Sequence, residues 1–412
     1  MRPQSAAPPA PPGRRARALA AVVWAGLAVL AATAPGGAIG QDQATPWPTS
    51  GWSRGTPDSQ GLDPARFAAL DQEIRGGKYG YVDRVLVTRR GRLVFDARYT
   101  QDYRAISRDR TGPLGCGEGC ADPDWLGDYN YYQPDRHPYY RGREVHTLQS
   151  VTKTVTATVI GAALVRGDLK SLDEPFLPFL RDRDLTNIDA RLRKATVRNL
   201  LTMKSGIAWQ EQGRPLDDSN TTLMMVRSKD WIAFTLAQPV ESTPGTTWNF
   251  NSGASQLLSG VVRGATGRFI DEYARDALFA PLGIRTWYWK KTPAGFPDTE
   301  GGLYLRAEDL AKIGYLYLRD GMWDGQRVLP EGFVRDATSP HTAGVFPGWD
   351  YGYQWWMTTR GRTRIWTGRG FGGQTLLVIP SLDVVAVAYA WNIFDEQAQD
   401  LTGSLLDAII QR

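Results

Sequence analysis

The chain has 412 residues, of which 42% are hydrophobic, and a formal net charge of +5. That length suits one large domain or two small ones with ample material for a core. The first forty residues hold four arginines and no acids, so removing them would lower the net charge to +1. The basic pI of about 9.1 therefore gives no support for nucleic-acid binding.

Residues 1–40 have the pattern of a signal peptide. Arg14, Arg15 and Arg17 precede an uncharged apolar run over 18–34, and small residues follow at 38–40. This order predicts a cleaved export signal and a periplasmic or secreted protein. The alternative is an uncleaved membrane anchor, for which the run is short. We therefore expect no stable membrane span after the signal is removed.

Two segments come next in the chain. Residues 82–100 combine two β-rich runs with a polar Arg-Arg-Gly-Arg turn, which predicts a hairpin. Residues 102–145 show no period and are rich in Gly, Pro, Asp and Tyr, as in a long functional loop. The loop's aromatic residues indicate either a lid packed over a cleft or a surface excursion.

Cys116 and Cys120 lie in this loop insertion. In an exported protein we expect them to form a local disulfide. A metal site is the alternative, but only His137 and His146 are near enough in sequence to add ligands. A calcium loop at 122–128 would lack a ligand at Leu126.

In the remaining chain, a helical stretch comes first and strands follow. Residues 150–166 are rich in β-branched side chains, but the run's length and the stop at Gly167 predict a buried helix. Helical patterns dominate from there to about residue 335. Four strands follow, at 351–358, 363–367, 375–380 and 384–391, and a closing helix spans 401–410.

This order predicts an α+β fold with an antiparallel sheet built from both termini and flanked by helices. The sheet lobe would take residues of about 55–101 and 336–412. A mostly helical lobe would take about 150–335, so that 41–412 form one domain with a cleft between the lobes.

Ser150 and Lys153 form the one Ser-x-x-Lys of the chain. On a helix, residues three apart share a face. The serine would feel the positive end of the helix dipole, and a desolvated lysine one turn on could accept its proton. The pair is therefore a candidate nucleophile and base.

Other common motifs point elsewhere or are missing. Residues 368–373 fit G-x-G-x-x-G, but a strand-like run follows them where a nucleotide-binding unit needs a helix. A glycine-rich strand edge that closely approaches a ligand is the better reading. The sequence has no G-x-S-x-G and no H-E-x-x-H.

Taken together, the motifs resemble the serine β-lactamase-like hydrolases, the group of class C β-lactamases, D-alanyl-D-alanine carboxypeptidases, esterases and 6-aminohexanoate-dimer hydrolases. The resemblance runs from about residue 55 to the C-terminus. The segments that carry it are HTLQSVTK at 146–153, TVRNLLTMKSG at 196–206, PGTTWNFNSG at 244–253, GGL at 301–303, DGMWDGQ at 320–326, YGYQWW at 351–356 and GFGGQTLLVIP at 370–380.

The resemblance implies that Ser150 is acylated and that Lys153 shares its proton. It also implies an oxyanion hole made by the backbone N–H groups of Ser150 and Phe371. Gly368, Arg369 and Gly370 occupy the third motif, where the family often has a lysine or histidine in place of Gly368. That change weakens a claim on β-lactam substrates, and Arg369 would normally point to the other side of the strand.

The second motif departs from the family. Ser252 fits its third position, but Phe250 stands where the family has a tyrosine that exchanges protons. Either Lys153 acts as sole base, or another tyrosine reaches in (Tyr304 or one from 129–140), or the site binds without turnover.

The sequence thus predicts an exported serine hydrolase that cleaves an amide or ester of a small molecule or short peptide, without a metal or organic cofactor. The alternative is a catalytically impaired relative that binds peptide or peptidoglycan-like ligands. A third reading is an envelope interaction protein that uses the aromatic loop at 125–140. Neither the substrate nor the oligomeric state follows from the sequence.

Overall fold

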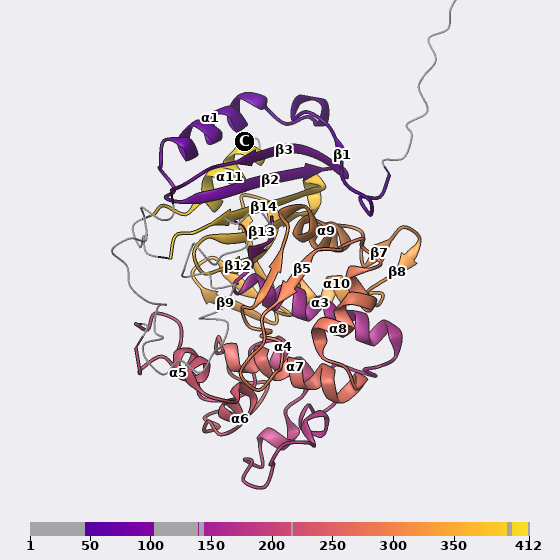
Figure 1. The fold of residues 1–412 in the computed structure, drawn as a ribbon, viewed down its shortest axis with the longest axis vertical. Helices are drawn as coiled ribbons and strands as arrows, with labels where there is room; N and C mark the ends of the chain where they lie inside the picture. The colour runs from indigo at the N-terminus through magenta and orange to yellow at the C-terminus, as the bar shows by residue number, and fades with distance from the viewer. Residues whose placement is uncertain (1–45, 103–138, 140–143, 216, 394–397, 411–412) are drawn as a thin grey trace, which may run out of the picture. The chain divides into compact units, whose positions relative to one another are not determined.

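Both ends of the chain build one nine-stranded sheet (Figure 1). The computed structural model describes residues 46–102, 139, 144–215, 217–393 and 398–410, which belong to one compact unit. In spatial order the strands are β1 (Ser53–Arg54), β3 (Arg92–Arg98), β2 (Val82–Arg89), β14 (Val384–Ala390), β13 (Gln374–Ile379), β12 (Thr363–Gly370), β11 (Trp356–Arg360), β10 (Trp349–Tyr351) and β9 (Thr342–Phe346).

Neighbouring strands pair antiparallel, except that β1 runs parallel to β3. The predicted α+β fold with a sheet from both termini is therefore confirmed. The hairpin expected over 82–100 is also present, as β2 and β3.

Helices cover both faces of this sheet. Along β14, Val384, Ala386 and Ala388 pack into one apolar cluster with α1 (Pro64–Arg75) and α11 (Leu401–Ile409). Val385 and Val387 enter the larger cluster on the other face, with α3 (Val151–Arg166) and α9 (Ala307–Leu318). This period of two follows from the pleat, and a sheet covered on both faces explains why β14 is apolar throughout.

Most of the remaining helices lie in the second lobe, below the sheet in Figure 1. The central one is α7 (Ser252–Thr266), which packs against α4 (Val197–Leu201), α6 (Trp231–Leu236) and α3. The others are α5 (Thr221–Arg227), α8 (Ile270–Ala274) and α10 (Phe333–Ala337).

The helical stretch is less purely helical than the sequence indicates. A three-stranded sheet joins β4 (His146–Thr147), β6 (Leu303–Leu305) and β5 (Trp287–Trp289), and a small hairpin pairs β7 (Met322–Trp323) with β8 (Gln326–Arg327). These strands are two or three residues long, too short for a period to show. The pairing of Thr147 with Tyr304 brings the Gly301-Gly302 segment beside Ser150.

The predicted strand at 351–358 is wrong as a single element, because the chain breaks between β10 and β11. The Gly352 N–H donates to the Trp355 carbonyl, and Gln354 adopts a left-handed conformation with φ 56°. The Gln354 N–H instead donates to the Leu201 carbonyl of the helical lobe. This long-range contact outweighs the local β propensity.

Several predictions concern parts of the chain outside the described residues. They are the signal peptide at 1–40, the disulfide between Cys116 and Cys120, and most of the loop at 102–145. Within the part that is described, none of the helices is long and apolar enough to cross a bilayer.

Arg84 ties the sheet to α9. Its guanidinium is 1% exposed and donates to both carboxylate oxygens of Asp96 and of Glu308. Burial acts to raise the pKa of Glu308, but the hydrogen bonds and charge of Arg84 outweigh it and hold that pKa below its usual value. The pair therefore stabilises the fold at neutral pH, and this contribution is lost as the pH falls through the lowered pKa.

We expect Arg84→Met to lower the free energy of unfolding by about 3–5 kcal/mol, because it removes the buried cation that both carboxylates share and leaves only the more distant Arg98 and Arg306 near Glu308. Urea unfolding of both proteins at pH 7 and at pH 4 measures this. The difference should shrink at pH 4, where the carboxylates of the variant take up protons. An equal loss at both pH values would contradict the charge argument.

Candidate active site

Ser150 stands at the N-terminus of the buried helix α3. It is the N-cap residue, with φ −63° and ψ −7°, and Gln149 before it has a positive φ of 44°. A non-glycine residue in this region is strained and is found mostly where the surrounding structure holds it for a purpose. Here the turn presents Ser150 at the positive end of the helix dipole.

Lys153 lies one turn along α3 and reaches back to the serine. Its Nζ is 2.9 Å from Ser150 Oγ, and the residue is 2% exposed. The predicted pair is therefore brought together in the geometry of a nucleophile and a proton acceptor.

The same ammonium group contacts Glu300, a residue that the sequence analysis did not single out. Lys153 Nζ donates to the Glu300 carbonyl oxygen at 2.8 Å and to Oε2 at 3.1 Å. Asp298 holds this turn, because its Oδ1 accepts from the N–H groups of Glu300 and Gly301. Thr299 anchors the turn to α7 through the Ser255 carbonyl.

Glu211 is a second, partly buried carboxyl at the site. Its Oε1 accepts from Ser252 Oγ at 2.8 Å, and its Oε2 accepts from the Ser252 N–H and from Trp209 Nε1. Burial raises the pKa of Glu211, and the nearby Glu300 carboxylate raises it further against the opposing effect of Lys153. Ser252, which fits the third position of the second motif, thus binds a carboxyl group and begins α7.

Phe250 faces Lys153 with its ring. The Lys153 Nζ lies 5.3 Å from the ring centroid, and the ring stacks on Trp356 at 5.7 Å. A cation over a ring face is favourable. Phe250, at the position of the family's tyrosine, therefore stabilises the ammonium group of Lys153 but offers no proton acceptor.

Of the replacement tyrosines proposed from sequence, Tyr304 and Tyr139 are among the described residues and have different surroundings. Tyr304 lines the same cavity as Ser150. Tyr139 donates its hydroxyl to the Asp83 carbonyl and packs edge-on against His146. Residues 129–138 and Tyr140 lie outside the described residues.

Strand β12 brings the third motif against α3. A Cβ atom at Gly368 would lie 2.9 Å from Val151 Cγ1, and one at Gly370 would lie 2.5 Å from the Leu148 carbonyl oxygen. A side chain at Gly368 therefore has no room here, which gives a steric reason for the missing lysine or histidine. Phe371 follows at the strand end and is 44% exposed.

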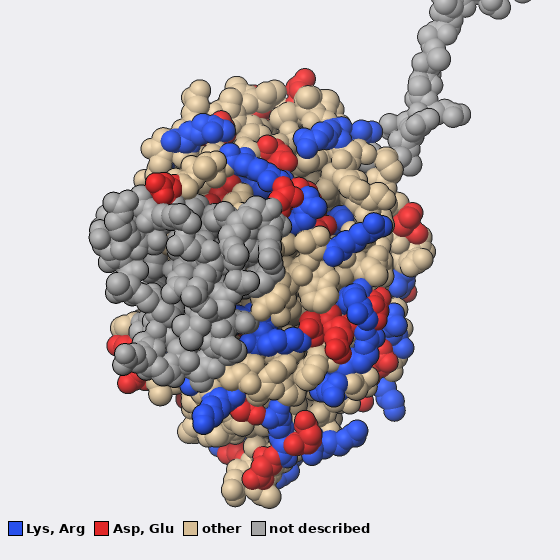
Figure 2. Space-filling view, in the orientation of Figure 1, with Lys and Arg blue, Asp and Glu red and all other residues tan. Residues whose placement is uncertain are grey.

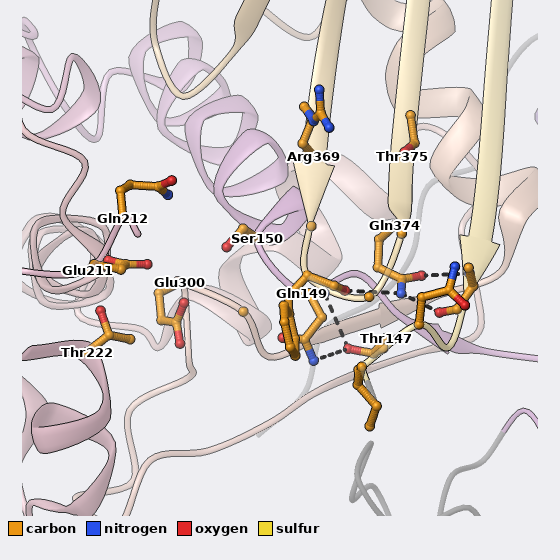
Figure 3. A pocket seen from close by; sticks show the side chains of 18 of the residues that line it. Thr147, Gln149, Ser150, Glu211, Gln212, Thr222, Glu300, Arg369, Gln374 and Thr375 are labelled. Carbon is orange, nitrogen blue, oxygen red and sulfur yellow. Dashed lines mark hydrogen bonds between the residues drawn. The ribbon is translucent and has the colours of Figure 1, made fainter. Parts of the chain in front are cut away.

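Arg369 alternates to the other side of the strand, as expected. It forms an ion pair with Asp400 at 3.0 Å, and its guanidinium lies 4.9 Å from the Trp349 ring centroid. Figure 3 shows its side chain directed away from Ser150.

These elements enclose a cavity of about 890 Å³. Figure 3 shows Ser150 between an acidic side, with Glu211 and Glu300, and a side formed by Gln149 and Gln374. Aromatic side chains complete the lining: Phe250, Tyr304, Phe346, Trp349, Trp356 and Phe371. Ser150 and Phe371, whose N–H groups are the predicted oxyanion hole, also line the cavity. Neither N–H donates to a carbonyl among the described turns and loops.

In the described part of the chain, no cluster of three or more His, Cys, Asp or Glu side chains could hold a metal ion. His146 Nε2 lies 2.8 Å from Asp83 Oδ2, with both residues fully buried.

Gly370→Ala is expected to lower kcat/KM by about 10²-fold, because the new methyl group would push β12 from the turn before Ser150 by a fraction of an ångström to one ångström. Ester hydrolysis measures it, with Gly403→Ala as control. Gly403 has nothing within 4 Å of its added Cβ. Full activity of Gly370→Ala would show that the close approach is not needed.

Comparisons with known proteins identify the family of this chain. The beta-lactamase family model matches residues 71–408, so the chain belongs to the beta-lactamase family, a family of serine hydrolases. The 6-aminohexanoate-dimer hydrolase of Paenarthrobacter ureafaciens is 26% identical over 284 residues, which cover 60% of this chain and 68% of that protein. The resemblance noted in the sequence is confirmed.

Solved structures share the fold at low sequence identity. A putative 6-aminohexanoate-dimer hydrolase from Bacillus anthracis superposes with a TM-score of 0.61 and 18% identity, over 83% of this chain and 79% of that one. A D-stereospecific amidohydrolase from Streptomyces sp. gives a TM-score of 0.56 and 18% identity, over 83% and 98%.

Two site residues, Glu211 and Glu300, were not predicted from the sequence. Glu300 directly precedes the Gly301-Gly302-Leu303 segment, and this adjacency is the one sequence signal that could have marked it. Glu211 follows the segment at 196–206 by five residues, with no spacing that indicates a role.

Proposed function

We propose that this protein is an exported serine hydrolase that cleaves an amide or ester bond through an acyl-enzyme on Ser150, with Lys153 as the proton acceptor. The observation that carries the proposal is the 2.9 Å contact between Lys153 Nζ and Ser150 Oγ at the N-terminus of α3. A nucleophile and a base within hydrogen-bond reach are the arrangement that acyl transfer needs.

The N–H groups of Ser150 and Phe371 would stabilise the oxyanion that forms when the serine attacks. Donors fixed before the reaction need no reorganisation in the transition state. Gly370 supports this role, because the absence of its side chain lets the strand just before Phe371 approach Leu148 and Gln149 in the turn before Ser150.

The cavity supports a small-molecule or short-peptide substrate. Its volume of about 890 Å³ lies in the range of small-ligand sites. Aromatic residues such as Trp349 and Trp356 favour an apolar group on the substrate. On the described surface seen in Figure 2, basic and acidic side chains are interleaved, which is not the pattern of a nucleic-acid interface.

The test is to incubate the protein with a fluorophosphonate probe and with short-chain p-nitrophenyl esters, with Ser150→Ala as the control. We expect labelling and turnover in the native chain that Ser150→Ala lacks. Equal labelling and equal background hydrolysis in the two proteins would exclude a hydrolase that acts through Ser150.

A second candidate is an impaired relative that binds peptide or peptidoglycan-like ligands without turnover. Phe250 favours it, because a missing acid–base group typically costs on the order of 10²–10⁴ in rate. Saturable binding of such a peptide, with no Ser150-dependent labelling, would identify this function.

Export is supported by the arginines and the apolar run of residues 1–40. Expression of the full chain followed by cell fractionation and N-terminal sequencing tests it. We expect a mature periplasmic or secreted protein that begins near residue 41. An intact N-terminus in the cytoplasm would rule export out.

A further inference from the structure

Lys153 has all of its hydrogen-bonding capacity occupied. A protonated lysine has three N–H donors, and Nζ has three acceptors within reach: Ser150 Oγ, the Glu300 carbonyl oxygen and Glu300 Oε2. The ammonium group therefore cannot take the serine proton unless it gives one of its own away. Of these acceptors, the carboxylate oxygen is the one that can keep a proton.

We propose that Glu300 is a positioning residue that takes a proton from Lys153 while Lys153 takes the proton of Ser150. This inference rests on the proposed function, since it concerns the same site. It gives the site the second proton-exchanging group that Phe250 cannot provide.

The step balances in both directions. As Ser150 Oγ bonds to the substrate carbonyl carbon, its proton moves to Lys153 Nζ, and another Nζ proton moves to Glu300 Oε2. When the tetrahedral adduct collapses, the bond to the leaving group breaks and the leaving nitrogen or oxygen takes a proton from Lys153. Lys153 then recovers one from Glu300, and water repeats the sequence to release the acyl group.

The structure holds Glu300 for such a role. The side chain is 15% exposed, so a charge shift between its carboxylate and Lys153 takes place largely away from water. In this step Lys153 remains an ammonium group, and the negative charge moves from the Glu300 carboxylate to the oxyanion, which the N–H groups of Ser150 and Phe371 would stabilise. Asp298 Oδ1 holds the N–H groups of Glu300 and Gly301, and the Thr299 contact with the Ser255 carbonyl holds the residue before Glu300.

Other charged or titratable groups around Glu300 are less suited. Glu211 faces Lys153 and Glu300, but its raised pKa means that it keeps its own proton to higher pH than an ordinary glutamate. Asp298 Oδ1 is engaged by backbone N–H groups, and its Oδ2 lies 3.7 Å from Lys290 Nζ. Tyr304 borders the cavity from β6.

The experiment measures kcat/KM for a p-nitrophenyl ester and the rate of fluorophosphonate labelling from pH 5 to pH 10. It compares the native chain with Glu300→Gln, Glu300→Asp and the exposed control Glu241→Gln. We expect Glu300→Gln to lose about 10²–10⁴-fold near pH 7. Its rate should climb toward alkaline pH, because hydroxide in solution can then take the proton that Glu300 no longer accepts.

Glu300→Asp keeps a carboxylate, so it should retain the native shape of the pH profile at a lower rate. Glu241→Gln should match the native chain. A purely structural role would lower the rate of Glu300→Gln equally at every pH, and that result, or native activity in Glu300→Gln, would overturn the inference. Thermal melting of each variant identifies any that fails to fold. If Glu300→Gln does not fold, the pH profile of kcat/KM for Glu300→Asp is compared with that of the native chain instead.

Failure of the proposed function gives a different result. In that case the native chain shows no Ser150-dependent labelling at any pH, whereas the inference alone fails if native labelling is strong and Glu300→Gln keeps it.

Discussion

Replacing Lys153 with methionine is expected to lower kcat/KM for a p-nitrophenyl ester by about 10²–10⁴-fold, the range for loss of a positioned proton-transfer group. Methionine fills most of the lysine's space in α3 but has no group that accepts a proton. Ser150 Oγ would then have to lose its proton to water. The pH profile of the variant should be flat where that of the native chain changes.

Lys153→Met should also lower the free energy of unfolding, because it leaves a carboxylate unpaired. Lys153→Met leaves the Glu300 carboxylate without its cation in a site that is largely buried, which typically costs about 3–5 kcal/mol. The double variant Lys153→Met/Glu300→Gln removes both charges, so it should recover much of the lost stability and none of the activity. Urea unfolding and ester hydrolysis of the native chain, Lys153→Met, Glu300→Gln and the double variant measure the two effects separately.

Recovery of activity in the double variant would contradict this account, because it would mean that Lys153 had acted on the rate through folding alone. Ser150→Ala is the matched control for the assay, since it removes the nucleophile and leaves the Lys153–Glu300 pair in place.

The sequence predicted the parts of this molecule that depend on local patterns. Strands β2, β3 and β12 to β14 have β-rich runs bounded by turns, and α3 has a stop at Gly167, so each could be found from its own residues. The break between β10 and β11 could not be found in this way. It depends on Leu201, which lies 153 positions from Gln354 and accepts its N–H.

The site shows the same division. Ser150 and Lys153 are three residues apart on one helix, so their contact follows from helix geometry. Glu300 reaches Lys153 only because β4 pairs with β6, with Thr147 opposite Tyr304. Strands of two or three residues leave no periodic signal, and the contact they create spans 147 positions. The unexpected member of the site is therefore the one that tertiary structure alone brings there.

Gly368 illustrates how the structure changes the meaning of a residue. From sequence it is a lost lysine or histidine, and hence a lost cation. In the fold, its backbone lies so close to Val151 and Thr154 that a Cβ atom would come within about 3 Å of each. The glycine is thus part of the packing between β12 and α3, and restoring a lysine there would move the strand.

In the Glu300→Gln chain, Phe250→Tyr is expected to raise kcat/KM by at least about tenfold. That factor is equivalent to about 1.4 kcal/mol of transition-state stabilisation. Phe250 lies with its ring 5.3 Å from Lys153 Nζ, at the position where the family resemblance implies a proton-exchanging tyrosine. A phenol there would supply a group that takes and returns protons. If Glu300 already supplies that function, the added hydroxyl should help little in the native chain and much in Glu300→Gln.

The comparison is a double-mutant cycle of the native chain, Phe250→Tyr, Glu300→Gln and the combined variant, measured by kcat/KM at pH 7. Two groups with the same function should show a coupling energy well above the few tenths of a kcal/mol expected for independent sites. Phe346→Tyr in the Glu300→Gln chain is the matched control, because it adds a phenol to the same aromatic lining without a ring face toward Lys153 and should restore nothing. If Phe250→Tyr instead raises both backgrounds by the same factor, the two residues act independently and Glu300 does not replace the tyrosine.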